Sequence, residues 1–142
     1  MPRPQKPRKR AQSQLKKTIP TVVAMAMEPQ MEILQRQALA SLADGWAGST
    51  QFDELVDCRD FLALGANVKE DEGVLALCDA ALEVLLLIRH RFDATGKIMA
   101  ESAELALLTD LVDVSQDFWG RTSGDFFIKA RRAFWEARTQ SA

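Results

Sequence analysis

The stretch that most constrains the fold is the apolar run from Gly73 to Phe92. Its apolar residues recur at steps of three and four, which is the spacing of one face of an α-helix. Between Ala80 and Ile88 the only polar residue is Glu83, so nearly every side of this helix is apolar. Such a helix has to be surrounded by other elements, and the dense run is shorter than the roughly 20 residues that span a bilayer. We therefore expect the central helix of a small all-α bundle.

Four amphipathic segments flank this helix and predict a five-helix bundle. The first begins near Glu28, with Pro29 at the first helical position, and a capping box at Thr50 to Asp53 opens the second. The expected helices cover residues 28–44, 50–67, 68–92, 97–119 and 124–138. Their expected buried faces include Leu34, Phe52, Val56, Leu82, Phe92, Phe127 and Phe134. The sequence therefore predicts one helical domain over residues 28–142, preceded by a separate segment of residues 1–27.

The charges are strongly segregated, although the net charge is only −2. Residues 1–17 carry seven basic residues and no acidic one, and residues 121–142 carry five basic and two acidic residues. Residues 28–120 carry six basic and eighteen acidic residues. This asymmetry predicts an anionic partner for the two ends of the chain.

Residues 1–17 are rich in Pro, Gln and basic side chains, so we expect a disordered arm. The next residues, Thr18–Met27, are apolar, and we expect them to lie along the bundle and cover edges of its core. A basic start before an apolar run is also typical of a secretory signal, but Glu28-Pro29 replaces the small-residue cleavage site. The chain has two cysteines, Cys58 and Cys78, inside helical patterns. We expect a reducing, cytoplasmic location and no membrane association.

The arrangements that enzymes need are largely missing from the sequence. His90 is the one histidine, the two cysteines form no CxxC pair, and no glycine-rich phosphate-binding motif is present. Two rows of aspartates return to one side of a helix, Asp53, Asp57 and Asp60, and Asp110, Asp113 and Asp117. They can be read as a solvated acidic face, as ligands of Mg²⁺ or Ca²⁺, or as a decoy for a basic groove on a nucleic-acid-binding protein. We expect the first reading, a protein that is not an enzyme, and no metal or cofactor.

The basic arm is the strongest functional signal. Flexible chains of 27 residues have ends roughly 30 Å apart, which is enough to reach along a duplex from an anchored bundle. No interleaving of arginines and aromatic residues suggests base stacking, so the expected contacts are to the phosphate backbone. The predicted nucleic-acid-binding residues are Arg3, Lys6, Arg8, Lys9, Arg10, Lys16 and Lys17. The alternative is a tail that only keeps the protein in solution.

A second predicted surface lies in the last helix. Phe127 and Phe134 share one face at a spacing of seven residues, whereas Phe126 and Trp135 cannot both share it. We therefore expect one of the latter to be exposed beside the neighbouring arginines. The predicted partner-binding residues are Trp135, Arg131, Arg132 and Arg138. A homodimer through this helix, or a complex with a host protein, would use such a surface.

Several strings of the chain resemble short, uncharacterised phage and prophage proteins of proteobacteria. They are QALASL, FDELVD, CDAALEVLLLIRHR followed by a TG turn, and LTDLVDVSQDFW. This resemblance implies a mobile-element origin and a helical fold, and it supplies no functional residues. Together with the charges, it favours a non-enzymatic accessory or regulatory protein that binds nucleic acid through its arm. The alternative function is a protein-binding modulator of a host complex, acting through the acidic helical face or the C-terminal patch.

Overall fold

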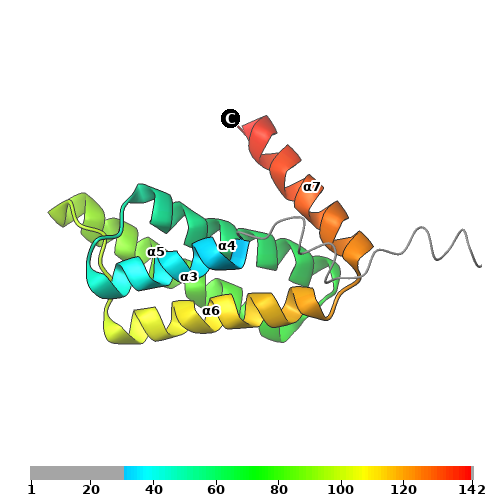
Figure 1. Ribbon diagram of the computed structural model, residues 1–142, viewed down its shortest axis with the longest axis horizontal. Helices are drawn as coiled ribbons and strands as arrows, with labels where there is room; N and C mark the ends of the chain where they lie inside the picture. The colour runs from blue at the N-terminus through cyan, green and yellow to red at the C-terminus, as the bar shows by residue number, and fades with distance from the viewer. Residues whose placement is uncertain (1–30, 142) are drawn as a thin grey trace, which may run out of the picture. The chain divides into compact units, whose positions relative to one another are not determined.

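The computed structural model describes residues 31–141, which form five α-helices and, within that range, no strand (Figure 1). The helices are α3 (Met31–Asp44), α4 (Ser49–Val68), α5 (Glu72–Thr95), α6 (Ser102–Gly120) and α7 (Gly124–Ser141). The predicted all-α class and the predicted number of helices are therefore confirmed. None of the described helices has both the length and the hydropathy that a membrane crossing requires.

The described residues belong to two compact units. The first, called the helical unit below, contains α3, α4, α5 and α6 as far as Phe118. The second contains the described residues from Trp119 onward, with α7. The expected arm (1–17), the apolar segment Thr18–Met27 and the expected helix start at Glu28-Pro29 lie outside the described residues.

The helices of the helical unit follow one another up and down (Figure 1). The backbone of α4 lies close to both α3 and α5. Arg59 of α4 donates a hydrogen bond of 3.1 Å to the carbonyl oxygen of Cys78 in α5. Side chains join α6 to its neighbours, with Arg91 of α5 bound to Glu104 and Arg36 of α3 bound to Asp113 at 2.6 Å. This order places the α3–α4 loop and the α5–α6 loop at the same end of the unit.

All four helices contribute to the interior of the helical unit. Its most deeply buried large side chains include Leu55, Phe61 and Leu62 of α4, Ile88 of α5, and Leu108, Leu111 and Val112 of α6. The expected buried faces were partly wrong: Leu34, Leu82 and Phe92 are exposed, and Phe52 and Val56 are only half-buried. Gln35 takes the buried position beside Leu34, because its amide oxygen accepts a hydrogen bond from Gln116 of α6.

The expectation that the apolar helix is surrounded on every side was also wrong. In α5 the buried residues are Val74, Cys78, Ala81, Leu85 and Ile88, which form a single stripe. Leu86 and Leu87 are each 53 % exposed, and Leu82 is 38 % exposed. The α5 helix therefore packs through one face, as its companions do, and leaves leucine side chains at the surface.

Several helix boundaries differ from the expected ones because local hydrogen bonds decide them. Helix α4 begins one residue earlier than expected, with the Gln51 side chain accepting from the Gly48 N–H at 2.9 Å. It also continues past Gly65 to Val68, and Glu70 then adopts a left-handed φ of 56°. Helix α5 begins after Asp71, whose carboxylate accepts from the Val74 N–H. Gly96, with a φ of 75°, ends α5, which is the left-handed conformation that glycine accepts at low cost.

The second unit is built around aromatic rings. Trp119 lies edge-on to Phe127, with ring centroids 5.5 Å apart, and is stacked with Phe126 at 5.9 Å. Phe127 and Phe134 are buried, as their shared face predicted. The Ser123 hydroxyl accepts a hydrogen bond from the Phe126 N–H and caps the start of α7.

Candidate functional site

The carboxylate rows do not form a metal site within the described residues. No group of three or more His, Cys, Asp or Glu side chains between residues 31 and 141 could hold a metal ion. Asp113 is bound to Arg36, and Asp60 is bound to Arg59 at 3.0 Å. His90 is exposed on α5. Asp60 and Asp113 are therefore engaged by arginines of the helical unit.

Both cysteines lie in the interior of the helical unit as free thiols. Burial raises the pKa of Cys58 to about 12 and that of Cys78 to about 11. The thiolate is the reactive form of cysteine, so a thiol held neutral by an apolar environment is a poor nucleophile. Both residues therefore act as small apolar side chains, in keeping with their helical positions.

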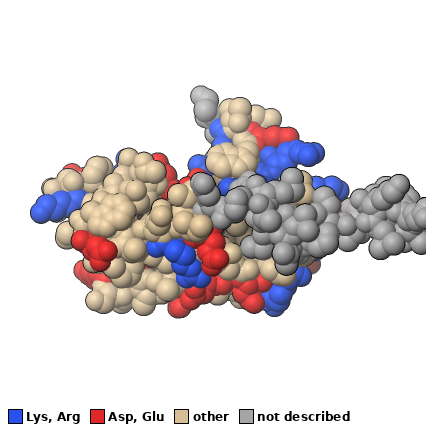
Figure 2. Space-filling view, viewed as in Figure 1, with Lys and Arg blue, Asp and Glu red and all other residues tan. Residues whose placement is uncertain are grey.

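The seven predicted phosphate-binding residues, from Arg3 to Lys17, lie outside the described residues. For nucleic-acid binding, the structure therefore gives the distribution of charge over the described residues. The described part of the helical unit carries seventeen acidic and six basic residues. Figure 2 shows acidic side chains (red) spread over much of its surface on the face in view. A polyanion would be repelled by most of this surface.

The structure brings together three of the four predicted partner-binding residues of α7. The guanidinium of Arg131 lies 5.1 Å from the ring centroid of Trp135 and 5.5 Å from that of Phe134. Arg138 lies 4.6 Å from the centroid of Phe134. Trp135 is 45 % exposed and Phe126 is half-buried, so the prediction that one of these two rings is exposed is confirmed.

Arg132, the fourth predicted residue, is exposed. Lys129 is also exposed, and neither residue forms an ion pair with any part of the chain that the structure describes. The α7 helix thus has two cations packed over aromatic rings and two that extend into solvent. The spacing of the aromatic residues predicts the arginines beside the rings, whereas Lys129 is not among the predicted partner-binding residues.

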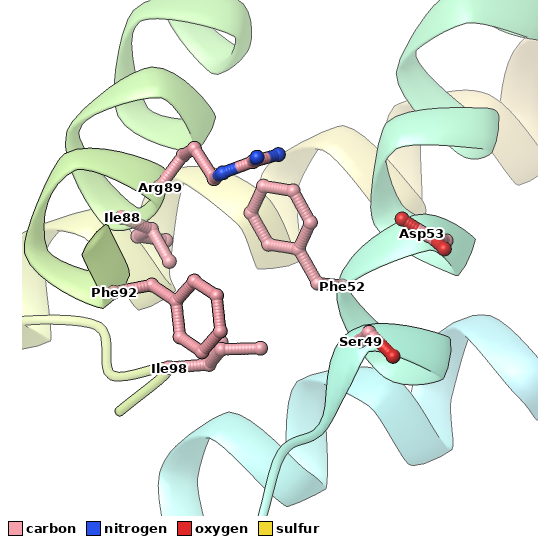
Figure 3. A pocket seen from close by; sticks show the side chains of 7 residues that line it. All are labelled: Ser49, Phe52, Asp53, Ile88, Arg89, Phe92 and Ile98. Carbon is pink, nitrogen blue, oxygen red and sulfur yellow. The ribbon is translucent and has the colours of Figure 1, made fainter. Parts of the chain in front are cut away.

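A hollow at the loop end of the helical unit was not predicted from the sequence. Figure 3 shows Phe52 of α4 facing Phe92 and Ile98, with Arg89 extending above the Phe52 ring and Asp53 and Ser49 on the α4 side. The hollow has a volume of about 70 Å³. A wider and more open recess of about 520 Å³ adjoins it. Its further lining includes Trp46 and Met99, which are 57 % and 47 % exposed.

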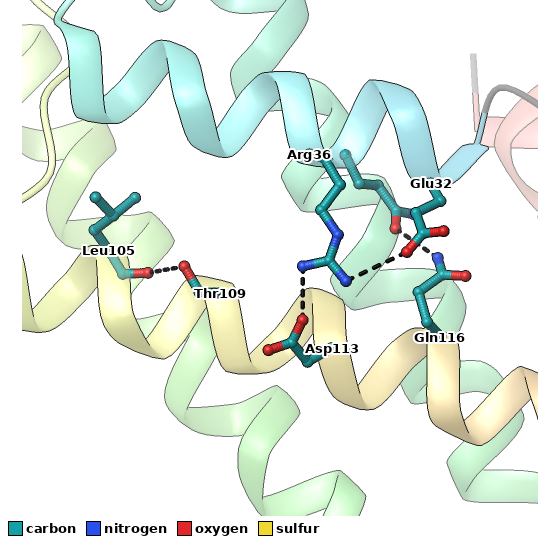
Figure 4. A network of polar contacts seen from close by, with 7 residues as sticks. Glu32, Arg36, Leu105, Thr109, Asp113 and Gln116 are labelled. Atoms are coloured by element: carbon teal, nitrogen blue, oxygen red, sulfur yellow. Dashed lines mark hydrogen bonds and ion pairs between the residues drawn. The ribbon is translucent and has the colours of Figure 1, made fainter.

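At least four of the six cations in the described part of the helical unit are paired with carboxylates. Arg36 contacts both Glu32 and Asp113 in the network of Figure 4, and Arg89 contacts Asp93 at 3.3 Å. Arg59 contacts Asp60 and, at 3.8 Å, Asp79. The fourth pair, between Arg91 and Glu104, is the most buried. Arg36, Arg59 and Arg91 join two helices, and Arg89 pairs within α5. These arginines have little charge left for an external anion.

The Arg91–Glu104 pair also fixes the start of α6. Burial acts to raise the pKa of Glu104, but the hydrogen bond from Arg91 and the one from the Glu101 N–H together lower it below its ordinary value. Glu104 therefore stays ionised where it caps the helix and binds the end of α5. This contact joins the end of α5 to the start of α6. It therefore holds both ends of the α5–α6 loop, which carries Ile98 and Met99.

Comparison with known proteins returned no match: no family model, no curated protein and no solved structure is similar to this chain.

Proposed function

We propose that the protein is a non-enzymatic accessory or regulatory factor of a phage or other mobile element, acting in the cytoplasm. In this proposal it binds the phosphate backbone of nucleic acid through the basic arm. The residues that contact phosphate are Arg3, Lys6, Arg8, Lys9, Arg10, Lys16 and Lys17. The helical unit serves as the body to which the arm is attached.

The division of charge is the observation that carries this proposal. The described part of the helical unit has a net charge of −11, and at least four of its six cations are paired with carboxylates. Residues 1–17 carry seven cations and no acid. An anionic body disfavours contact with a polyanion everywhere except at the cationic ends, so phosphate binding is directed to the arm.

Two cations of α7 provide a second contact in the same proposal. Lys129 and Arg132 are exposed and have no carboxylate partner among the described residues. Each cation that neutralises a phosphate adds about 0.9 to the logarithmic salt dependence of binding to a duplex. The arm therefore dominates with seven cations, and α7 adds at most two.

The proposal is tested by titrating a fluorescent duplex with the full chain and with a variant whose seven arm cations are replaced by Gln. We expect the arm variant to bind at least about 100-fold more weakly at 0.1 M salt. Lys97→Gln, which removes an exposed cation from the helical unit, is the matched control and should bind as the parent chain does. Equal binding by the parent chain and the arm variant would overturn the proposal.

A second candidate function is binding of a host protein through α7. The observation that favours it is the cluster of Arg131, Trp135 and Arg138, in which a half-exposed Trp lies beside two guanidinium groups. Trp and Arg are the residues most enriched at the energetic centres of interfaces. Under this alternative, Trp135→Ala abolishes recovery of a partner after nuclease treatment, and a nuclease-sensitive complex would argue against it.

The same α7 surface is also suited to a homodimer. Sedimentation of the parent chain and of Trp135→Ala separates this possibility from a host partner. A dimer that becomes a monomer on substitution would identify a second copy as the occupant of the surface.

A further inference from the structure

The loop end of the helical unit carries an apolar surface that the proposed function does not use. We call it the loop-end surface and define it by Trp46, Phe52, Phe92, Ile98 and Met99. The small hollow and the wide recess both include Ser49, Phe92 and Ile98 in their lining, so they form one continuous surface. In Figure 2 the end of the helical unit over these loops shows uncharged side chains (tan) with acidic and basic groups beside them.

The exposure of these side chains is high for large apolar groups. Trp46 is 57 % exposed, Met99 is 47 % exposed and Phe92 is 37 % exposed. Single exposed apolar residues are common, but a group of them around a recess is typical of a binding surface. Trp and Met are also enriched where proteins bind one another.

The size of the hollow favours a single inserted side chain over an enclosed small molecule. Pockets for substrates and cofactors usually have volumes of 300–1,000 Å³ and enclose most of the ligand, whereas the hollow between Phe52 and Phe92 has about 70 Å³. That volume suits a single aliphatic side chain. The adjoining recess of about 520 Å³ is more open, and its lining includes Gly45, Ala47 and Gly48. At the centre of a protein–protein interface, one side chain commonly fills a pocket and a broader contact surrounds it.

The charged residues at the rim of the hollow indicate which side chains of a partner would lie beside the inserted apolar one. Asp53 lines the hollow, is exposed, and forms no ion pair within residues 31–141. The cation on the opposite rim, Arg89, is already bound to Asp93 at 3.3 Å. Asp44, which directly precedes the α3–α4 loop, is exposed as well. Lys97, an exposed cation, lines the adjoining recess, so the unpaired acidic charge lies at the hollow itself. Asp53 there is complementary to a cationic residue close to the apolar anchor.

We propose that the loop-end surface is a docking site for an amphipathic helix of a partner protein, with one aliphatic anchor for the hollow and Lys or Arg residues beside it. A helix presents an anchor and its cationic neighbours on one face at spacings of three and four. No strand lies within the described residues, so pairing of a partner strand with a sheet edge is not available there. A second copy docking through the same acidic unit would bring two charges of −11 together.

The test uses two designed helical peptides and the full chain. Both have Leu at positions i, i+4 and i+7; one has Lys at the flanking positions, and the other has Glu. We expect Trp46→Ser and Met99→Ser each to weaken binding of the Lys peptide about tenfold or more. Leu86→Ser, which removes an equally exposed apolar side chain (53 %) from α5, should leave that binding unchanged.

Two further binding measurements complete the test. Asp53→Asn should weaken binding of the Lys peptide about three- to fivefold and make it less sensitive to salt. Binding of the Glu peptide should not respond to Trp46→Ser. The proposal is overturned if Trp46→Ser and Leu86→Ser bind the Lys peptide equally well. It is also overturned if Trp46→Ser converts a dimer into a monomer in sedimentation, because a second copy is then the occupant.

Discussion

The two described units use their positive charges in different ways. In residues 31–118, four arginines are bound to carboxylates, and these pairs join α3 to α6, α4 to α5, and α5 to α6. In α7, Arg131 and Arg138 lie over the rings of Phe134 and Trp135. A carboxylate neutralises a guanidinium, whereas an aromatic ring holds it in place and leaves its positive charge.

This difference predicts different costs of removing the two kinds of arginine. Removing an arginine from the buried pair of the helical unit leaves a carboxylate without its counter-charge, so the free energy of unfolding falls substantially. Removing an arginine that lies over a ring of α7 costs less. The predictions below test this contrast from the largest expected effect to the smallest.

The interior of the helical unit gives the largest effect, because aliphatic packing rather than charge holds it together. Leu85 is 3 % exposed and its neighbour Leu86 is 53 % exposed. We expect Leu85→Ala to lower the free energy of unfolding by about 2–5 kcal/mol, and Leu86→Ala to change it by less than about 0.5 kcal/mol. Urea unfolding of both variants measures the difference. Equal losses would mean that α5 is buried on both sides.

The buried ion pair of the helical unit gives the next largest effect. Arg91→Gln leaves the Glu104 carboxylate, whose side chain is 11 % exposed, without its cation. We expect a loss of about 1–3 kcal/mol at neutral pH, measured by thermal and urea unfolding. Glu104→Gln is the matched variant, because it removes the charge and retains much of the shape.

The same pair predicts a pH dependence with a defined sign. The pKa of Glu104 is lowered in the folded state, so its contribution to stability is complete above the ordinary pKa of Glu, about 4.3. That contribution is lost as the pH falls through the lowered folded-state value. The parent chain should therefore lose more stability between pH 5 and pH 3 than Glu104→Gln does. Identical pH profiles would contradict a role for this carboxylate.

Much of the helical architecture follows from the sequence, because apolar spacing and glycine chemistry are local signals. The turn at Gly96 and the buried positions of Phe127 and Phe134 are examples. The end of α4 is not set by a local signal. Gly65 is a good helix terminator by its chemistry, but it is buried inside the helix, and Glu70 takes the left-handed conformation instead. Tertiary packing of α4 overrides the local preference.

The loop-end surface could not be predicted for a related reason. Its residues come from the α3–α4 loop, the start of α4 and the region from the end of α5 to the start of α6, which meet only after the helices have packed. Trp46 directly follows Gly45 in the sequence, and nothing in its neighbourhood indicates Ile98 or Met99. Likewise, the leucine run of α5 does not show which leucines are buried, since Leu82, Leu85 and Leu86 differ only in the direction they face.

The aromatic cluster of α7 gives a smaller effect on stability. Arg131→Gln removes a guanidinium that lies over two rings, and we expect a loss of about 0.5–1 kcal/mol. The emission of Trp135 should shift in the same variant, which places the change at this ring. A loss as large as that of Arg91→Gln would show that α7 depends on charge as the helical unit does.

The exposed pair between α3 and α6 gives the smallest effect. The side chains of Arg36 and Asp113 are 41 % and 56 % exposed, and exposed pairs contribute about 0.2–1 kcal/mol. We expect Arg36→Gln to lower stability within that range at low salt and to match the parent chain in 1 M NaCl. A difference that persists at high salt would indicate packing by the arginine stem instead.

The most direct test of the central claim is the salt dependence of duplex binding by the full chain. If the seven arm cations contact phosphates while the paired arginines of the helical unit do not, the logarithm of the binding constant falls with the logarithm of salt concentration at a slope of about −6, or about −8 when both α7 cations also contact phosphates. The variant with Gln at the seven arm positions should show a slope of about −2 or weaker. A parent slope near zero, or the same slope in both proteins, would contradict the account.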